Sequence, residues 1–238
     1  MLPYLNTDSP FPRVDEALQE PNGLLAAGAD LSPQRLMRAY ADGIFPWFSP
    51  GEPILWWSPD PRAVFFVDNF KVNRSVIKTL KKYPLKVTLN VDFNRVIEEC
   101  AAPRGDEHGT WITDEMINAY AELHRQSRAH SVEVWHNEQI VGGIYGVVTG
   151  GVFCGESMFS RISNGSKIAL TCLVLFLKQL NFKLVDCQIE NPHLVKLGTS
   201  LISREVYLQL LRESSNLKIA QSVWQPQTLN WRRLLGVE

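Results

Sequence analysis

The second half of the chain carries the pattern that most limits its fold: a meander of strands, a strongly apolar helix and then a buried strand. Residues 131–136 alternate as a strand, and the turn at Asn137-Glu138 returns the chain through 140–148 as a hairpin. Residues from 152 onward extend this sheet, a helix runs from Ser163/Asn164 to about residue 180, and 183–188 is a buried strand. This order predicts one mixed, largely antiparallel sheet with a helix crossing over to its last strand.

The first half of the chain has shorter elements separated by prolines. Residues 1–30 indicate irregular structure, and Ser32-Pro33 begins a helix that Gly43 follows, because Ser is a good N-cap and Pro fits the first turn. Proline-rich loops and edge strands follow to about residue 62. We then expect helices over 71–82, from Asp92 to about 100 and over 113–128, and a strand over 85–91.

These elements predict an α/β (α+β) protein with two domains. Residues 1–62 would form an irregular and helical segment with the first part of a small N-terminal α/β domain. Residues 63–105 would complete that domain with a basic helix, and residues 106–238 would form the larger C-terminal domain. The boundary lies in the loop around Pro103 and Gly105, because proline and glycine in a polar run are typical of a connection.

Composition and charge describe an ordinary globular protein. The 238 residues are 45% hydrophobic and 21% charged, with a net charge of -1, so any contact with nucleic acid must come from a local basic patch. The N-terminus lacks a signal-peptide pattern, and no apolar run approaches the roughly 18 residues of a membrane span. The four cysteines show no CxxC spacing. We therefore expect a cytoplasmic protein with reduced thiols and no zinc site.

Two acids stand inside apolar strands, where a charge is costly unless it is paired or functional. Glu156 lies in the string CGESMF, and Asp186 lies two residues before Gln188 in LVDCQ. In a regular strand Asp186 and Gln188 share one face, with Cys187 on the other. One interpretation is a structural salt bridge, for example between Glu156 and Arg161 or Lys167. The other is a site that holds a cation and moves a proton.

A run of cations precedes these strands. No acid interrupts it, and most of its members recur at three- and four-residue steps, which places them on one helix face. The members are Lys71, Arg74, Lys78, Lys81, Lys82 and Lys86. Such a run can be a solvated helix face, but in a protein of net charge -1 it favours contact with nucleic-acid phosphates, which would be independent of sequence and sensitive to salt.

The order of elements after residue 113 resembles the acyltransferase (GNAT-like) fold that usually holds acetyl-coenzyme A. Those enzymes need a glycine-rich turn whose amides bind the pyrophosphate at a helix start. The corresponding turn here, residues 161–166, has one glycine. An acyltransferase without that turn is expected to take its acyl group from another carrier.

Several long strings resemble one family, the leucyl/phenylalanyl-tRNA–protein transferases of bacteria. They are EPNGLLAAGADLSP, GIFPWFSPGEPILWWSPDPRAV, HGTWIT, HSVEVW, VGGIYGV, FCGESMFSR and VDCQ. The resemblance implies transfer of Leu or Phe, with Met as a further candidate, from aminoacyl-tRNA to the α-amine of proteins that begin with Lys or Arg. It also implies that these proteins then enter the N-degron pathway of regulated proteolysis.

The resemblance also assigns residues. Trp47 and Trp111, in loop-like strings, would stack on the 3′-terminal adenosine of the tRNA, whereas Trp56 and Trp57 are expected in the core. An apolar pocket would read the transferred side chain and reject polar ones. Its expected members are Ile144, Phe153, Met158, Leu170, Leu173 and Val185.

The acids would serve the acceptor protein. Asp186, acting through Gln188, would help to remove the proton of the attacking amine, and Glu156 would hold the cationic N-terminal residue. The alternative is that the terminal ribose hydroxyl of the tRNA moves the proton. Ester-to-amide transfer is downhill, so we expect no cofactor and no metal, with aminoacyl-tRNA as a substrate, and by default a monomer.

Two other functions remain open at this point. A coenzyme A-dependent N-acetyltransferase would share the fold, and the missing glycine-rich turn argues against it. A tRNA-binding module without chemistry would retain tRNA but form no peptide product.

Overall fold

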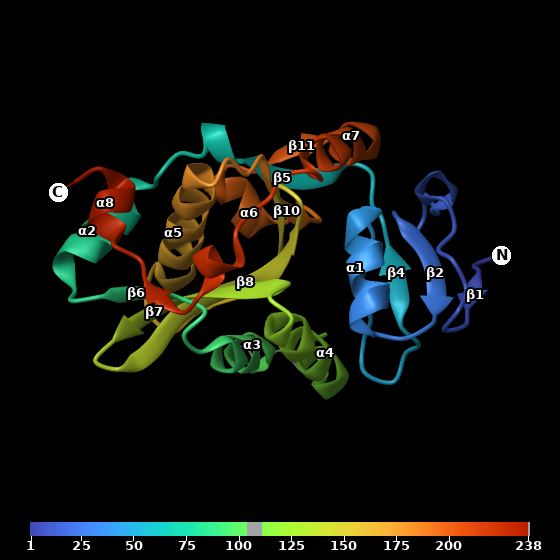
Figure 1. The fold of residues 1–238 in the computed structure, drawn as a ribbon, viewed down its shortest axis with the longest axis horizontal. Coiled ribbons are helices and arrows are strands. Elements are labelled where there is room, and N and C mark those ends of the chain that lie inside the picture. The colour runs from blue at the N-terminus through green and yellow to red at the C-terminus, as the bar shows by residue number, and fades with distance from the viewer. Residues whose placement is uncertain (104–110, 238) are drawn as a thin grey trace.

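The computed structural model describes residues 1–103 and 111–237, and within these ranges the strands form two sheets. The small sheet has the order β1-β2-β4-β3 and lies at one end of the molecule (Figure 1). Its strands are Tyr4–Leu5 (β1), Leu24–Gly28 (β2), Phe45–Pro46 (β3) and Leu55–Trp57 (β4).

The large sheet has the order β11-β5-β10-β9-β8-β7-β6-β12. Its strands are Arg62–Phe66 (β5), Lys86–Leu89 (β6), Ala129–His136 (β7), Gln139–Thr149 (β8), Val152–Ser160 (β9), Leu184–Gln188 (β10), Ser200–Ile202 (β11) and Gln227–Thr228 (β12). Strands β9 and β10 pair in parallel, and the other neighbours in this order pair antiparallel. The predicted α/β fold with a mixed, largely antiparallel sheet is confirmed.

Helices cover both faces of the large sheet. Alternate residues of a strand point to opposite faces, so Val64, Leu184 and Tyr145 join one buried cluster, whereas their neighbours Phe65 and Val185 join the other. The first cluster contains residues of α1, α3 and α4, and the second contains residues of α2 and α5. The helices are Pro33–Ala41 (α1), Arg74–Lys82 (α2), Phe93–Ala101 (α3), Asp114–Arg125 (α4), Gly165–Gln179 (α5), Pro192–Leu197 (α6), Arg204–Ser214 (α7) and Trp231–Leu235 (α8).

Local signals place most helix ends where we expected them. Side chains of Ser32, Asp92 and Asn191 accept backbone hydrogen bonds at the starts of α1, α3 and α6. The expected helix over 71–82 is wrong at its start, because the Asn73 side chain accepts from the backbone N–H of Ser75 and the helix begins at Arg74. Lys71 therefore precedes the helix.

Residues 63–105, which we assigned to the small N-terminal domain, contribute their strands to the large sheet. Strand β5 pairs with β10 and β11, and β6 pairs with β7 and β12, all in the large sheet. These partners lie far away in the sequence, where no local pattern reveals them. The expected boundary between residues 105 and 106 lies outside the described residues.

The C-terminal segment packs into the second cluster through Trp224, Leu229 and Trp231. The ring of Trp224 stacks on buried His130 with 3.9 Å between centroids, and its carbonyl accepts a 2.7 Å hydrogen bond from Asn90. In the described parts of the chain, no helix has the length and apolar character that crossing a membrane requires.

Candidate active site

Two β-bulges shape the site. Strand β9 pairs with β8 through Gly155 and Ser157, so Glu156 is an extra residue between them. Strand β10 pairs with β5 through Asp186 and Gln188, so Cys187 is an extra residue there. Bulges re-aim side chains and often lie beside active sites. These two occur on adjacent strands, where β9 and β10 run in parallel.

The bulge on β10 overturns the expected arrangement of Asp186, Cys187 and Gln188. Gln188 has a left-handed φ of 62°, and the alternation of a regular strand is lost. Cys187 and Gln188 both line the large cavity described below, whereas Asp186 is fully buried and does not. The expected shared face of Asp186 and Gln188 is therefore wrong.

Asp186 instead forms a buried ion pair with Arg62. Arg62 Nε and Nη2 donate to Oδ1 and Oδ2 of Asp186, each at 2.8 Å, and both side chains are almost completely buried. Tyr207 Oη donates to Oδ2 at 3.0 Å, and the backbone N–H of Gln188 donates to Oδ1 at 2.9 Å. Bidentate geometry and added hydrogen bonds satisfy both charges. Asp186 thus holds the backbone of the bulge in place.

Of the two strand acids, Glu156 is the one that lines the cavity. Its side chain accepts hydrogen bonds from Tyr120 Oη at 3.0 Å and from Gln188 Nε2 at 2.9 Å, and Tyr120 Oη in turn bonds Tyr40 Oη. Burial raises the pKa of Glu156 to about 7, although the hydrogen bonds from the tyrosines and Gln188 oppose the shift. A carboxyl group with this pKa can gain and lose a proton near neutral pH.

The salt-bridge interpretation of Glu156 does not hold for Arg161. Arg161 Nε donates to Glu99 Oε2 at 2.6 Å, and Glu99 also pairs with Arg95 at 2.7 Å. Arg161 is therefore engaged at the mouth of the cavity, and the partners of Glu156 are the neutral groups of Tyr120 and Gln188.

A cavity of about 1200 Å³ joins these groups to an apolar wall. Of the six residues expected to read the transferred side chain, Ile144, Met158, Leu170 and Val185 line it. Phe153 and Leu173 are completely buried in the same cluster, behind this wall.

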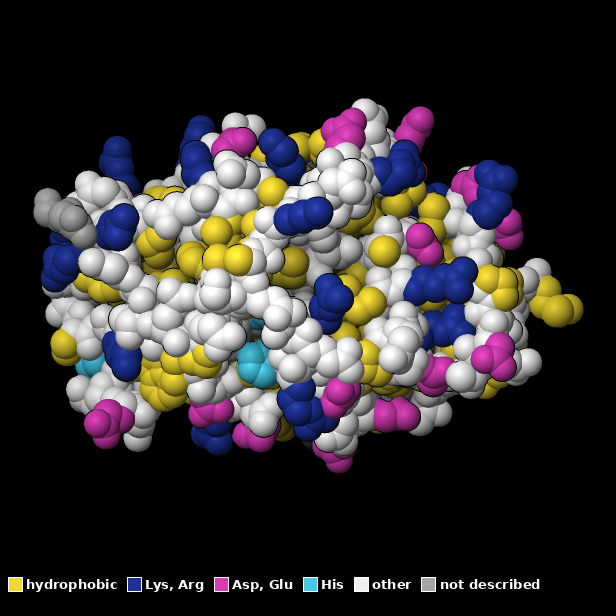
Figure 2. Space-filling view, viewed as in Figure 1, with side chains coloured by type: hydrophobic (Ala, Val, Ile, Leu, Met, Phe, Trp, Pro, Cys, Tyr) yellow, Lys and Arg dark blue, Asp and Glu magenta, His cyan; other side chains and the backbone are white. Residues whose placement is uncertain are grey.

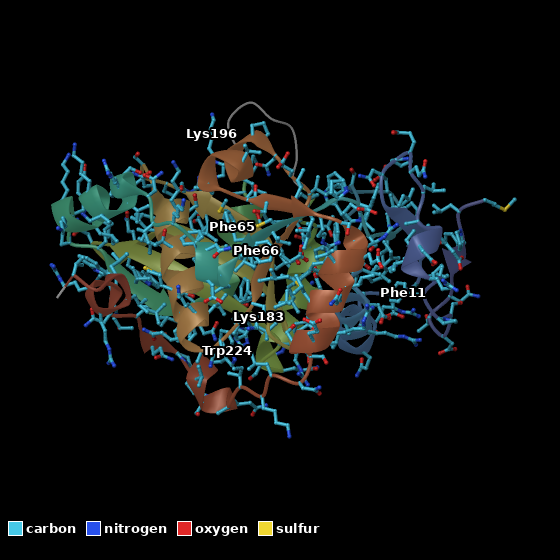
Figure 3. All side chains as sticks on the ribbon, turned by 90° about the horizontal axis from the view of Figure 1, so that it is seen from above. Phe11, Phe65, Phe66, Lys183, Lys196 and Trp224 are labelled. Carbon is cyan, nitrogen blue, oxygen red and sulfur yellow. The ribbon has the colours of Figure 1, made fainter. Side chains whose placement is uncertain are left out.

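Sequence reasoning missed Phe65, which lines the apolar wall and lies near the centre of the molecule (Figure 3). It also missed Tyr40, Tyr120, Tyr207 and Arg62. The one available signal was Arg62, a charge beginning the apolar string RAVFF. The tyrosines resemble ordinary core residues of amphipathic helices.

The two loop tryptophans reach the same cavity. Trp47 and Trp111 both line it, and Trp47 is 41% exposed. Trp57 supports Trp47, because its Nε1 donates to the Trp47 carbonyl at 2.6 Å and the two rings lie 5.5 Å apart. Trp56 is buried and donates to the carbonyl of Gly28, as a core residue does.

The basic run has the exposed face that its spacing predicts. Val76 and Leu80 of α2 are buried, whereas the cations of the helix are exposed to solvent. These are Arg74, Lys78, Lys81 and Lys82, with Lys71 and Lys86 exposed beside the helix. Helix α2 lies at the end of the molecule opposite the small sheet (Figure 1), and Lys and Arg side chains project from that end (Figure 2).

Comparison with known proteins identifies the class. The family model for leucyl/phenylalanyl-tRNA protein transferase matches residues 64–212, and the model for the N-terminal domain of that family matches residues 29–60. Curated relatives named leucyl/phenylalanyl-tRNA–protein transferase include one from Shewanella woodyi, 51% identical over 94% of this chain and 95% of the relative. Another, from Nitrosospira multiformis, is 51% identical over 94% of this chain and 97% of the relative.

The protein is thus an aminoacyltransferase. It belongs to the leucyl/phenylalanyl-tRNA protein transferase family. Solved structures of similar shape are more distant: L-PGS from Bacillus licheniformis has a TM-score of 0.40 at 11% identity, covering 89% of this chain and 70% of that chain. A likeness at this level is too low to support an inference.

Proposed function

We propose that this enzyme transfers Leu, Phe or Met from aminoacyl-tRNA to proteins whose N-terminal residue is Lys or Arg. The observation that carries the proposal is one cavity in which an apolar wall, a buried carboxyl group and two tryptophans meet. These are the parts needed to hold an apolar side chain, a cationic acceptor and an unpaired adenosine together.

The apolar wall suits the transferred side chain. Ile144, Met158, Leu170 and Val185, together with Phe65, offer no hydrogen-bond partner from their side chains to a polar amino acid. The unbranched side chain of Met158 can adapt to both Leu and Phe. Trp47 and Trp111 would stack on the terminal adenosine and set the ester in front of Glu156.

Glu156 and Gln188 suit the acceptor. A cation that enters beside Glu156 favours its charged form, so binding of the acceptor is itself expected to deprotonate the carboxyl group. The carboxylate can then take a proton from the α-ammonium group. The free amine attacks the ester carbonyl and the C–N bond forms. As the C–O bond to the ribose breaks, the attacking nitrogen loses its second proton to the ribose oxygen, and Glu156 keeps the first.

Asp186 takes a different role from the one we expected. Because it is buried against Arg62 and Tyr207 and lies outside the cavity wall, we assign it to positioning. Its hydrogen bond to the backbone of Gln188 places that side chain within reach of Glu156.

We further infer that the modified proteins enter regulated proteolysis by the N-degron pathway. The reaction would take place in the cytoplasm, with a monomeric enzyme and without a cofactor. Membership of the family supports these points.

A transfer assay tests the proposed function. Radiolabelled Leu-, Phe-, Met- and Ile-tRNA are each offered with peptides that begin with Arg, Lys or Ala and are otherwise identical. We expect product from the first three with the Arg and Lys peptides only. Equal labelling of the Ala peptide would contradict the acceptor assignment, and efficient transfer of Ile would contradict the pocket.

A further inference from the structure

A second, smaller cavity lies beside the basic helix. Its volume is about 370 Å³, which is within the range of small-ligand sites. Its wall comes from the end of α2, the end of β7 and the loop before α5: Lys78, Thr79, Lys82, Tyr83, His136, Ile162 and Ser163. Among the described residues that line it there is no carboxylate, so its charge is positive.

The groups around this cavity combine two kinds of chemistry. Lys78 and Lys82 provide ammonium groups and Ser163 provides a hydroxyl group, all of which can donate hydrogen bonds to phosphate oxygens. The Thr79 hydroxyl already donates to the Ser75 carbonyl at 2.9 Å. Tyr83 is 41% exposed and packs edge-on against His136, with 6.0 Å between ring centroids, and Lys82 Nζ lies over the Tyr83 ring at 4.9 Å from its centroid. Cations beside an accessible ring are the features that bind an unpaired nucleotide.

The cavity is tied to the active site through one loop. Asn164 Nδ2 donates to Thr79 Oγ1 at 3.0 Å, and Ser75 Oγ donates to Asn164 Oδ1 at 3.4 Å, so α2 is fastened to the start of α5. The loop begins with Arg161, which lines the active-site cavity, and its next residue, Ile162, lines the second one. The two cavities are therefore lined by consecutive residues of one loop.

We propose that this second cavity binds a nucleotide of the unpaired 3′ end of the tRNA, upstream of the terminal adenosine. The phosphate lies between Lys78 and Lys82, and the base packs against Tyr83. The inference rests on the proposed function, because it presumes that the adenosine itself occupies the cavity with Trp47 and Trp111. The proposal gives the basic helix one defined contact, with a single nucleotide, in addition to its general electrostatic attraction for tRNA phosphates.

Short donors of two lengths test the proposal. Phenylalanyl-adenosine contains only the terminal nucleoside, whereas the phenylalanyl trinucleotide ending in CCA also reaches the second cavity. Lys82→Ala and Tyr83→Leu should each lower kcat/KM for the trinucleotide roughly 10-fold, the scale of one charge-assisted hydrogen bond or one stacked base. Transfer from phenylalanyl-adenosine should change less than about twofold in either variant, because it makes no contact there.

Two further lysines separate a local contact from a general loss of charge. Lys81 is the neighbour of Lys82 on α2 but does not line the cavity, so Lys81→Ala should weaken transfer from whole aminoacyl-tRNA and leave the trinucleotide unaffected. Lys218→Ala removes the same charge from an exposed position in the C-terminal segment and should change neither. Thermal melts check that all four variants remain folded.

Each other outcome counts against the second cavity. If Lys81→Ala and Lys82→Ala lowered kcat/KM for the trinucleotide equally, the effect would come from the general positive charge of the helix. If Lys82→Ala and Tyr83→Leu lowered transfer equally from both short donors, these residues would act in the active site or in protein stability. If Lys82→Ala and Tyr83→Leu both left kcat/KM for the trinucleotide unchanged, no nucleotide would bind in the second cavity. The proposed function fails separately, by absence of transfer from every donor with the unmodified enzyme.

Discussion

Gln188 Nε2 donates a 2.9 Å hydrogen bond to Glu156 Oε1 across two adjacent bulged strands. The backbone N–H of the same glutamine donates to buried Asp186 at 2.9 Å. One residue therefore links the carboxyl group that faces the cavity to an ion pair that does not. This relationship divides the two acids into one that meets the substrates and one that positions its partner.

The first prediction concerns the buried ion pair. Asp186→Asn leaves the Arg62 charge without a counter-charge, so urea unfolding should show a loss of about 3–5 kcal/mol. Tyr207→Phe removes only one hydrogen bond to Asp186 and should cost about 1 kcal/mol. A fall in single-turnover rate should accompany the destabilisation, since the one remaining oxygen must serve both Arg62 and the backbone N–H of Gln188. A fully stable Asp186→Asn protein that is about 100-fold slower at saturating peptide would instead give Asp186 a direct chemical role.

The second prediction follows from the raised pKa of Glu156. Its pKa is about 7 in the folded protein, whereas the ordinary value for a glutamate is 4.5, so the folded state resists ionisation and this group lowers stability as the pH rises from about 4.5 to 7. Glu156→Gln removes that penalty. It should stabilise the protein by up to about 3 kcal/mol at pH 8 and by almost nothing at pH 4. Urea titrations at both values measure the difference, and a constant difference would refute the assigned pKa.

The third prediction concerns the acceptor. Glu156→Gln should raise KM for peptides that begin with Arg or Lys, because the counter-charge is lost, and it should lower kcat, because the carboxylate that takes the proton is lost. In the unmodified enzyme kcat/KM should rise with pH through about 7 as Glu156 ionises. In the Glu156→Gln variant, the pH profile of kcat/KM should show only the rise that comes from deprotonation of the peptide amine. An identical pH profile in both proteins would mean that Glu156 ionisation does not control the reaction.

The fourth prediction concerns the transferred side chain. Met158→Ala opens the cavity wall and should cost Leu transfer roughly 1–3 kcal/mol in kcat/KM. Leu173 lies behind the wall, so Leu173→Ala should lower the free energy of unfolding by about 2–5 kcal/mol while the ratio of Leu to Phe transfer stays within about twofold. If Leu173→Ala shifts that ratio more than Met158→Ala does, the assigned wall is wrong.

The fifth prediction concerns salt. Replacing Lys78, Lys81 and Lys82 together with Ala should weaken tRNA binding similarly for all isoacceptors. The slope of log affinity against log salt should fall by about 0.7–0.9 for each lost phosphate contact. Filter binding at several salt concentrations provides the measurement, with Lys218→Ala as the matched control. An unchanged slope would place the tRNA elsewhere on the protein.

Local sequence was sufficient for most of the helices and for the meander, but not for β1 and β2, which lie in residues 1–30 that we expected to be irregular. The caps at Ser32, Asp92 and Asn191 and the turn at 137–138 act through residues within three or four positions of one another. Apolar periodicity likewise revealed the meander, the long helix and the exposed face of α2. Glu156 and Gln188, selected from their settings in the sequence, line one cavity with Trp47 and Trp111, which the family resemblance assigned.

Only the tertiary structure decided which way the key side chains point. A bulge depends on the strand that lies opposite. The residues next to Glu156 and Asp186 in the sequence therefore do not predict that Glu156 points into the cavity or that Asp186 is buried. Arg62 reaches Asp186 across 124 positions of the chain. Because a buried charge is tolerated only where its partner is packed beside it, that pairing of distant segments separates the positioning acid from the one that faces the substrates.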